Sequence, residues 1–132
     1  MNKIPKILSI AGSDSGGGAG IQADIKAISF HKGYAMTVLT AVTAQNTLGV
    51  QEIFPLPKEI IKKQLESVLD DLTPDVIKTG MLADHETIEL ISEFIEKISS
   101  DGEVTTATIR QENKEKQKTF ESDLGDAGEV LE

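Results

Sequence analysis

The spacing of hydrophobic residues along the first hundred positions alternates between two patterns. Short runs rich in β-branched residues are typical of strands, and the segments between them repeat hydrophobic residues every three to four positions, as on one face of a helix. We predict strands over about 6–11, 36–44 and 75–78, a short apolar run over 50–54, and helices over about 20–32, 57–72 and 84–98. Strands that alternate with helices in this way are typical of βαβ units around a mostly parallel sheet.

Local signals support the ends of these helices. Gly33 stands where a helix commonly stops, Pro57 suits the first turn of the second helix, and Asp84 is a favourable N-cap for the third. The signals agree with the hydrophobic spacing, so the alternating pattern predicts one small α/β domain.

The pattern changes after Ser100. Residues 101–132 keep neither spacing for any length, and the run over 110–118 is wholly polar. Nine acidic and four basic residues give this segment a charge of −5, out of −9 for the whole chain. Such a segment buries too little apolar surface to offset the entropy lost on ordering. We therefore predict a folded part over 1–100 and a divergent, acidic, disordered or out-of-frame tail over 101–132.

Composition excludes several classes of protein. A chain of 132 residues with no cysteine has no disulfide framework and no thiolate metal site. The residues from Met1 to Lys6 lack the apolar core of a signal peptide, and no segment approaches about 18 consecutive apolar residues. No basic stripe interleaved with aromatic residues is present, which argues against nucleic acid. We expect a soluble cytoplasmic protein with no membrane and no nucleic acid among its partners.

Five glycines fall within positions 12–20, directly after the first predicted strand and before the first helix. Glycine permits positive φ and a close approach of a ligand to the backbone, and a helix N-terminus favours polar or anionic groups. The loop lacks the lysine of a P-loop. Gly18, Gly20 and Ala23 satisfy only a relaxed dinucleotide fingerprint, with no acidic residue at the expected distance. A binding loop and a tight turn that binds nothing both remain open.

Three loops are predicted to meet at one edge of the sheet, since ligands of parallel α/β sheets bind outside the carboxyl ends of the strands. They cover 12–20, 45–49 and 79–82. Gln45 is the most informative side chain outside the glycines, because its amide both donates and accepts, as the edge of an amino-heterocycle requires. A solvated loop glutamine is the alternative.

Other candidate side chains carry weaker signals. Asp24 lies in the first turns of the glycine-loop helix, where it serves either as a ligand or as a solvated partner of the helix dipole. Met81 packs either on a flat ring or in the core. His31 and His85 are expected at the surface, so we predict no metal site.

Three ordered stretches carry a specific resemblance. They read IAGSDSGGGAGIQADIK over 10–26, TAVTAQNTLGVQ over 40–51 and KTGML over 78–82. In these motifs the chain resembles the hydroxymethylpyrimidine and phosphomethylpyrimidine kinases of thiamine biosynthesis. The resemblance implies a ribokinase-like α/β fold, a Rossmann-like three-layer arrangement around a parallel sheet, truncated here to its N-terminal half. It also implies ATP-dependent phosphorylation of 4-amino-5-hydroxymethyl-2-methylpyrimidine and of its monophosphate.

The resemblance further implies which residues bind the pyrimidine. Gln45 would hydrogen-bond to the aminopyrimidine, and five residues would line the same pocket: Gly12, Ala19, Asp24, Thr43 and Met81. ATP and Mg²⁺ are implied as cofactors, and the family allows a homodimer. The residues that bind the nucleotide belong to a half of the family fold without a counterpart here, so we expect no catalytic residue and no metal ligand in this chain.

The resemblance is expected to end near Ile98. Family members continue there with a hydrophobic strand that ends in a D-P-V-M-like motif, and later with a G-T-G-C-like anion hole, whereas 101–132 resembles neither. We therefore expect the chain to be inactive alone. A non-catalytic pyrimidine-binding half-domain and a gene remnant are the alternatives, and pyridoxal kinases on the same fold are a weaker alternative for the substrate.

Overall fold

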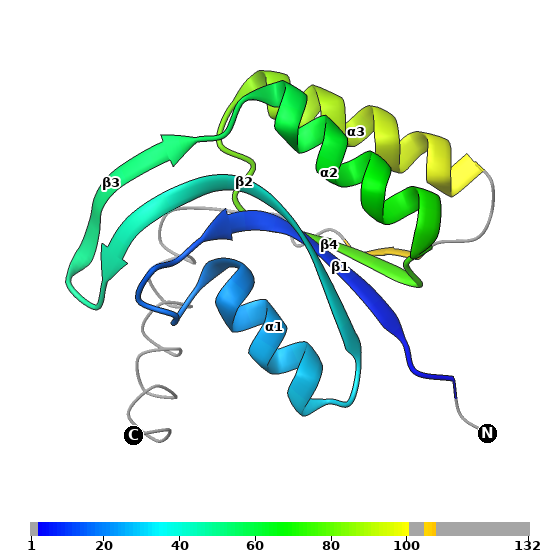
Figure 1. The fold of residues 1–132 in the computed structure, drawn as a ribbon, viewed down its shortest axis with the longest axis horizontal. Coiled ribbons are helices and arrows are strands. Elements are labelled where there is room, and N and C mark those ends of the chain that lie inside the picture. Colours follow the sequence, from blue (N-terminus) through cyan, green and yellow to red (C-terminus); the bar gives the residue numbers. More distant parts are fainter. Residues whose placement is uncertain (1–2, 101–104, 108–132) are drawn as a thin grey trace.

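A computed structural model describes residues 3–100 and 105–107 (Figure 1). The elements in chain order are β1 (Lys6–Ser13), α1 (Gly20–Phe30), β2 (Tyr34–Asn46), β3 (Gly49–Pro55), α2 (Lys58–Asp71), β4 (Val76–Thr79), α3 (His85–Ser100) and β5 (Thr105–Ala107). The strands form one sheet in the order β3-β2-β1-β4-β5. This arrangement confirms the predicted α/β class with mostly parallel strands.

Strand β1 lies in the middle of the sheet and runs parallel to both β2 and β4. Its residue Leu8 is paired with Met36 on one side and with Ile77 on the other. A central strand is covered on both faces, and β1 suits this position because its middle residues are apolar or small and are all buried. The carboxyl ends of β1, β2 and β4 therefore lie at one edge of the sheet.

The helices cover the two faces of the sheet unequally. Of the helices in the described residues, α1 lies on one face, whereas α2 and α3 lie side by side on the other (Figure 1). The buried core forms between the sheet and the α2–α3 layer. It consists of Leu8, Ile10, Met36, Val38, Ile61, Leu65, Ile77, Leu90 and Ile91. Helix α1 has no buried residue of its own. Most of the hydrophobic stabilisation thus comes from one of the two interfaces.

Strand β3 runs antiparallel to β2, with Val42 paired to Phe54. The two strands are joined only by Thr47 and Leu48, and a parallel connection needs a crossover of about a dozen residues or more. The apolar run predicted over 50–54 is therefore the second strand of a hairpin rather than a further parallel strand.

Helix α1 ends two residues earlier than predicted. Lys32 has a φ of 62°, and the N–H of Gly33 donates to the carbonyl of Ile28 at 2.9 Å, so Lys32 rather than Gly33 takes the left-handed position. A Cβ on Gly33 would lie 2.8 Å from Cγ2 of Ile28. Position 33 requires glycine because a side chain there would clash with Ile28. The positive φ that ends the helix is at Lys32.

Strand β5 lies within the segment predicted to be disordered. It pairs in parallel with β4, with Val76 opposite Thr105, and so occupies the sheet position beyond β4. Three residues are too few for a hydrophobic period to show in the sequence. The predictions for 101–104 and 108–132 lie outside the described residues. Within the described ranges no helix combines the length and apolar character needed to cross a membrane.

Candidate functional site

The three predicted loops meet at the carboxyl edge of the sheet, since they follow β1, β2 and β4. Two hydrogen bonds connect the third loop, which follows β4, to β1 and β2. The N–H of Gly80 donates to the carbonyl of Ile10 at 2.8 Å, and the hydroxyl of Thr40 donates to the carbonyl of Met81 at 2.7 Å. The edge predicted from the sequence is therefore a single connected region of the protein.

Asp14 organises the glycine loop. It is only 5% exposed, and its carboxylate accepts hydrogen bonds from the backbone N–H groups of Gly16 at 2.7 Å, Gly18 at 2.9 Å and Ala19 at 2.8 Å. The N–H of Gly17 donates to the carbonyl of Asp14 at 3.0 Å. The loop thus folds around its own carboxylate, and these N–H groups are not free to bind a ligand.

Gln22 fixes the start of the loop to helix α1. Its Oε1 accepts the N–H of Asp14 at 2.8 Å, and its Nε2 donates to Oγ of Ser13 at 2.7 Å. Because Gln22 sits in the first turn of α1, the turn and the helix hold one another in a fixed geometry. The sequence analysis assigned no role to this amide.

Two glycines of the site are required by close approaches. Gly20 has a φ of 58°, and a Cβ there would collide with the carbonyl oxygen of Gly12. A Cβ on Gly12 would lie 2.6 Å from Cε of Met81. The structure therefore brings Gly12 and Met81, both predicted to line the pocket, into direct contact.

Gln45 is held against the glycine loop by its backbone. Its N–H donates to Oγ of Ser15 at 2.8 Å, and the Ser15 hydroxyl donates back to the carbonyl of Gln45 at 2.8 Å. The hydroxyl of Thr43 lies 2.6 Å from the carbonyl of Ser13 and 3.2 Å from Oε1 of Gln45. Thr43 is buried and Gln45 is half-buried. The ends of β1 and β2 are thus joined through Thr43 and Gln45, two of the six residues predicted to bind the ligand.

Asp24, on α1, lies against an earlier part of β1 than the other predicted residues. Its Oδ2 accepts the Ser9 hydroxyl at 2.6 Å and the Lys78 ammonium at 2.7 Å, with the Asp24 and Lys78 side chains 19% and 26% exposed. The reading of Asp24 as a solvated partner of the helix dipole is therefore wrong, because the carboxylate joins α1 to β1 and β4. Its role as a ligand stays a prediction.

Five predicted residues surround the end of β1, and Asp24 is bonded three residues earlier on that strand. The five are Gly12, Ala19, Thr43, Gln45 and Met81. Sequence reasoning missed Asp14 and Lys78. An aspartate two residues before a glycine is a signal for a side-chain turn, which could have identified Asp14. No spacing in the sequence indicates that Lys78 pairs with Asp24.

The described residues do not fit a nucleotide–metal group. Across 3–100 and 105–107, no three or more His, Cys, Asp or Glu side chains gather as they would to hold a metal ion. The contact between His85 and Glu89, at 3.0 Å, joins two exposed residues one turn apart on α3. The glycine-loop donors, which resemble a phosphate cradle, are taken by Asp14.

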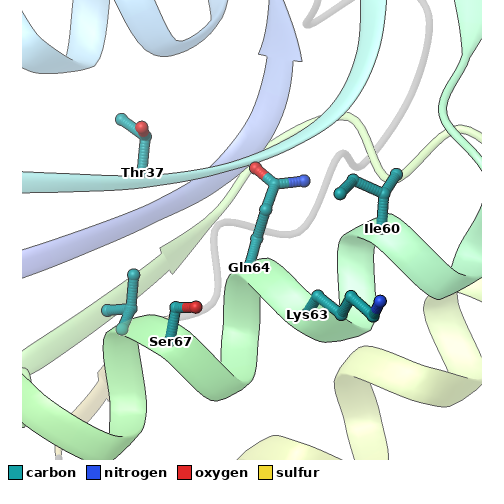
Figure 2. A pocket seen from close by; sticks show the side chains of 6 residues that line it. Thr37, Ile60, Lys63, Gln64 and Ser67 are labelled. Carbon is teal, nitrogen blue, oxygen red and sulfur yellow. The ribbon is translucent and has the colours of Figure 1, made fainter.

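A shallow pocket of about 290 Å³ lies away from the three loops, between β2 and α2 (Figure 2). Figure 2 shows Gln64 of α2 extended toward β2. Its Oε1 accepts the N–H of Leu39 at 2.8 Å and its Nε2 donates to the carbonyl of Leu39 at 3.0 Å. The pocket is thus next to a structural contact and includes none of the residues predicted to bind the ligand.

Comparison with known proteins gives a consistent family. Residues 14–116 match the phosphomethylpyrimidine kinase family. The hydroxymethylpyrimidine/phosphomethylpyrimidine kinase of Bacillus subtilis (strain 168) is 52% identical over 94 residues, which are 71% of this chain and 35% of that protein. The family match continues past Ser100, so the expectation that the resemblance ends near Ile98 is corrected.

Solved structures agree with the sequence match. A phosphomethylpyrimidine kinase from Clostridium difficile 630 has a TM-score of 0.73 and 47% identity, over 78% of this chain and 46% of that chain. The pyridoxal kinase from Staphylococcus aureus in complex with AMP-PCP and pyridoxal has a TM-score of 0.67 and 40% identity, over 73% of this chain and 36% of that one. The chain therefore has the fold of these ribokinase-like vitamin kinases and spans between a third and a half of the length of each protein compared.

Proposed function

Because this chain belongs to the phosphomethylpyrimidine kinase family, we propose that it binds 4-amino-5-hydroxymethyl-2-methylpyrimidine at the carboxyl edge of its sheet. The ligand would lie against the end of β1, among the loops that follow β1, β2 and β4. The residues that contact it in this proposal are Gly12, Ala19, Asp24, Thr43, Gln45 and Met81.

The fixed position of Gln45 carries the proposal. Ser15 holds its backbone by two hydrogen bonds of 2.8 Å, and the Thr43 hydroxyl lies 3.2 Å from its side-chain oxygen. A carboxamide held this way presents a donor and an acceptor side by side, which matches the ring nitrogen and amino group of an aminopyrimidine. Ordering the amide before binding also lowers the entropy cost of recognising the ring.

Met81 supplies the apolar wall. It is half-buried, and its Cε would meet any Cβ placed on Gly12 at 2.6 Å, so the thioether lies close against the backbone of β1. Methionine sulfur makes favourable contacts with aromatic rings. The ring in this proposal is oriented at its polar edge by Gln45 and contacted on its apolar side by Met81.

We propose that the kinase activity of the relatives, with ATP and Mg²⁺ as cofactors, needs residues beyond those described here. The neighbour from Staphylococcus aureus is a complex with AMP-PCP, an ATP analogue. The glycine-loop donors of this chain are already taken by Asp14, and residues 3–100 and 105–107 contain no cluster suited to a metal ion. This chain alone thus binds the pyrimidine without phosphorylating it.

Calorimetry of the 132-residue chain tests this function. We expect the aminopyrimidine alcohol to bind with one-to-one stoichiometry and Gln45→Ala to weaken binding at least about tenfold, since two hydrogen bonds to the ring are lost. Gln51→Ala is the matched control, because Gln51 is an exposed glutamine of β3 that bonds only within the hairpin in the described structure. Absence of binding, or equal binding by the two variants, would contradict the proposal.

Pyridoxal is the second candidate, because the chain is 40% identical to a pyridoxal kinase whose structure contains pyridoxal. Pyridoxal lacks the amino group beside a ring nitrogen, so Gln45 has less to recognise. In the same calorimetric series we expect pyridoxal to bind more weakly and to depend less on Gln45. Tighter binding of pyridoxal than of the aminopyrimidine would reverse the choice of substrate.

A further inference from the structure

The glycine loop has the geometry of an anion site. The backbone N–H groups of Gly16, Gly18 and Ala19 are directed at one small region before the start of α1, where the helix dipole also favours negative charge. In other proteins such loops bind phosphate groups. Here that region is filled by the carboxylate of Asp14.

The carboxylate is fixed firmly in that position. Oδ1 accepts the N–H of Gly16 at 2.7 Å, and Oδ2 accepts those of Gly18 at 2.9 Å and Ala19 at 2.8 Å. The N–H of Asp14 itself donates to Gln22 at 2.8 Å, and the residue is 5% exposed. An external anion would have to displace a buried charge that already makes three charge-assisted hydrogen bonds.

The conformation of the glycines follows from their packing against this carboxylate. A Cβ on Gly16 would lie 3.2 Å from Oδ1 of Asp14 and 3.1 Å from the carbonyl oxygen of Gln45. Gly17 has a φ of 81°, which directs the chain around the side chain. Contacts within the loop are therefore enough to explain why glycine is needed at these positions, and no bound phosphate has to be invoked.

One cation lies close by and needs to be weighed. Lys26 of α1 donates to the carbonyl of Gly17 at 2.8 Å, on the exposed side of the loop. Its charge attracts anions in general, but its bond is to a carbonyl and leaves the backbone N–H groups of the loop bound to Asp14. The hydrogen-bonding capacity of the loop is therefore decided by Asp14.

We propose that Asp14 determines specificity by occupying the anion site of the glycine loop, so that this loop accepts an uncharged ring and excludes phosphate groups. Phosphates of a nucleotide or of a phosphorylated pyrimidine then bind outside residues 12–20. The inference rests on hydrogen bonds within the loop and holds whichever ring binds beside it.

Titration with inorganic phosphate at constant ionic strength tests this inference on the ¹⁵N-labelled 132-residue chain. In the wild type, we expect the amide resonances of Gly16, Gly18 and Ala19 to show no saturable shift. In Asp14→Ala, the vacated donors are expected to shift together and saturate, with an affinity for phosphate at least about tenfold above the wild type. Formate, which replaces the missing carboxylate, should raise the Tm of Asp14→Ala and leave that of the wild type unchanged.

Asp84→Asn is the matched control, since Asp84 is an aspartate at the start of another helix, α3, where it accepts the N–H of Thr87 at 2.8 Å. It should respond to phosphate as the wild type does. A saturable phosphate shift of the three loop amides in the wild type overturns the proposal, as does a folded Asp14→Ala whose loop amides respond to neither anion. If Asp14→Ala folds only with formate present, that rescue supports the proposal, and failure of formate to restore the fold counts against it.

Discussion

Single side chains hold the candidate site together mainly through contacts between the loops and α1. Asp14 closes the glycine loop, Gln22 ties it to the helix, and Asp24 reaches from the helix to Ser9 and Lys78 on two strands. The bonds made by Gln22 and Asp24 join residues eight or more positions apart in the sequence. The position of α1 on its face of the sheet is therefore set by polar contacts as well as by packing.

The Asp24–Lys78 pair should contribute measurably to stability. In Lys78→Met the Asp24 carboxylate loses its cation while still largely shielded from water, so we expect a loss of about 1–3 kcal/mol in the free energy of unfolding. Urea denaturation measures it. Lys62→Met is the control, because Lys62 and Glu66 form an exposed pair at 3.7 Å and the expected change is below about 0.5 kcal/mol. Equal losses in the two variants would show that the Asp24–Lys78 pair is no stronger than a surface pair.

The candidate site was predictable at this scale only in part. Gln45 and the glycines stand out because their chemistry is unusual for loops, and the structure does bring Gln45, Thr43 and Gly12 to the end of β1. The spacing of Asp14 and Gly16 signals a side-chain turn, but it does not show that the same carboxylate also accepts the N–H groups of Gly18 and Ala19. That depends on φ and ψ along the loop, such as the φ of 81° at Gly17.

At the scale of elements, the helices were easier to predict than the direction of the strands. A stripe of apolar residues identifies α2 and α3, because those residues must face the core. The antiparallel course of β3 depends on the short connection after Asn46, and an apolar run alone does not reveal direction. Strand β5 is shorter than any period that reasoning from a single sequence detects.

Strand β3 pairs with β2 only from Ala41 onward, and at Leu39, before that point, a side chain from α2 bonds to β2 instead. Gln64 bonds both the N–H and the carbonyl of Leu39, the pairing that a neighbouring strand would otherwise provide. We expect Gln64→Leu to lower the free energy of unfolding by about 1–3 kcal/mol, since two backbone groups lose their partner. Faster hydrogen exchange at the amide of Leu39 should accompany the loss.

Gln51→Leu provides the comparison for this prediction. Gln51 donates to the carbonyl of Gly49 and to Oδ1 of Asn46 within an exposed hairpin, so its loss should change stability by less than about 0.5 kcal/mol. If exchange at Leu39 is the same in Gln64→Leu and in the wild type, water replaces the glutamine without cost and the protective role is refuted.

For the molecule as a whole, two aspartates link stability to acid pH. The backbone N–H of Lys6, and then the Lys3 ammonium, hold the pKa of Asp75 below its usual value of 3.8. The backbone N–H of Thr87 does the same for the pKa of Asp84. A lowered pKa in the folded state means that the unfolded chain binds more protons, so this stabilisation is present above about pH 4 and is lost as the pH falls through the folded-state values.

Urea midpoints measured from about pH 6 to about pH 3 test this link. The wild type should lose stability as the pH falls below about 4, and the double variant Asp75→Asn, Asp84→Asn should show a shallower decline, because its two amides do not titrate. An identical decline in both proteins would mean that other carboxylates control the acid response.

The layered α/β architecture was predictable for the whole molecule, because the alternation of strands and helices restricts the fold to few arrangements. The pattern does not show that the described helices cover the two faces of the sheet unequally, α1 on one face and both α2 and α3 on the other (Figure 1). That difference depends on how much apolar surface each helix buries, which is visible only once Leu65 and Ile91 are seen packed in the core.

The small share of α1 in the buried core has a consequence for the timing of ligand exchange. Among the described residues α1 has none that is buried and is tied to the strands by polar bonds of Gln22 and Asp24, so we expect it to detach at a lower free energy than the sheet and the α2–α3 layer and to open more often than the protein unfolds. Ala19 lies at the start of α1 and Asp24 lies within it, whereas Gln45 lies at the end of β2 and Met81 follows β4. A ligand that contacts both groups holds the helix down, and the time it stays bound is then limited by how long α1 remains closed.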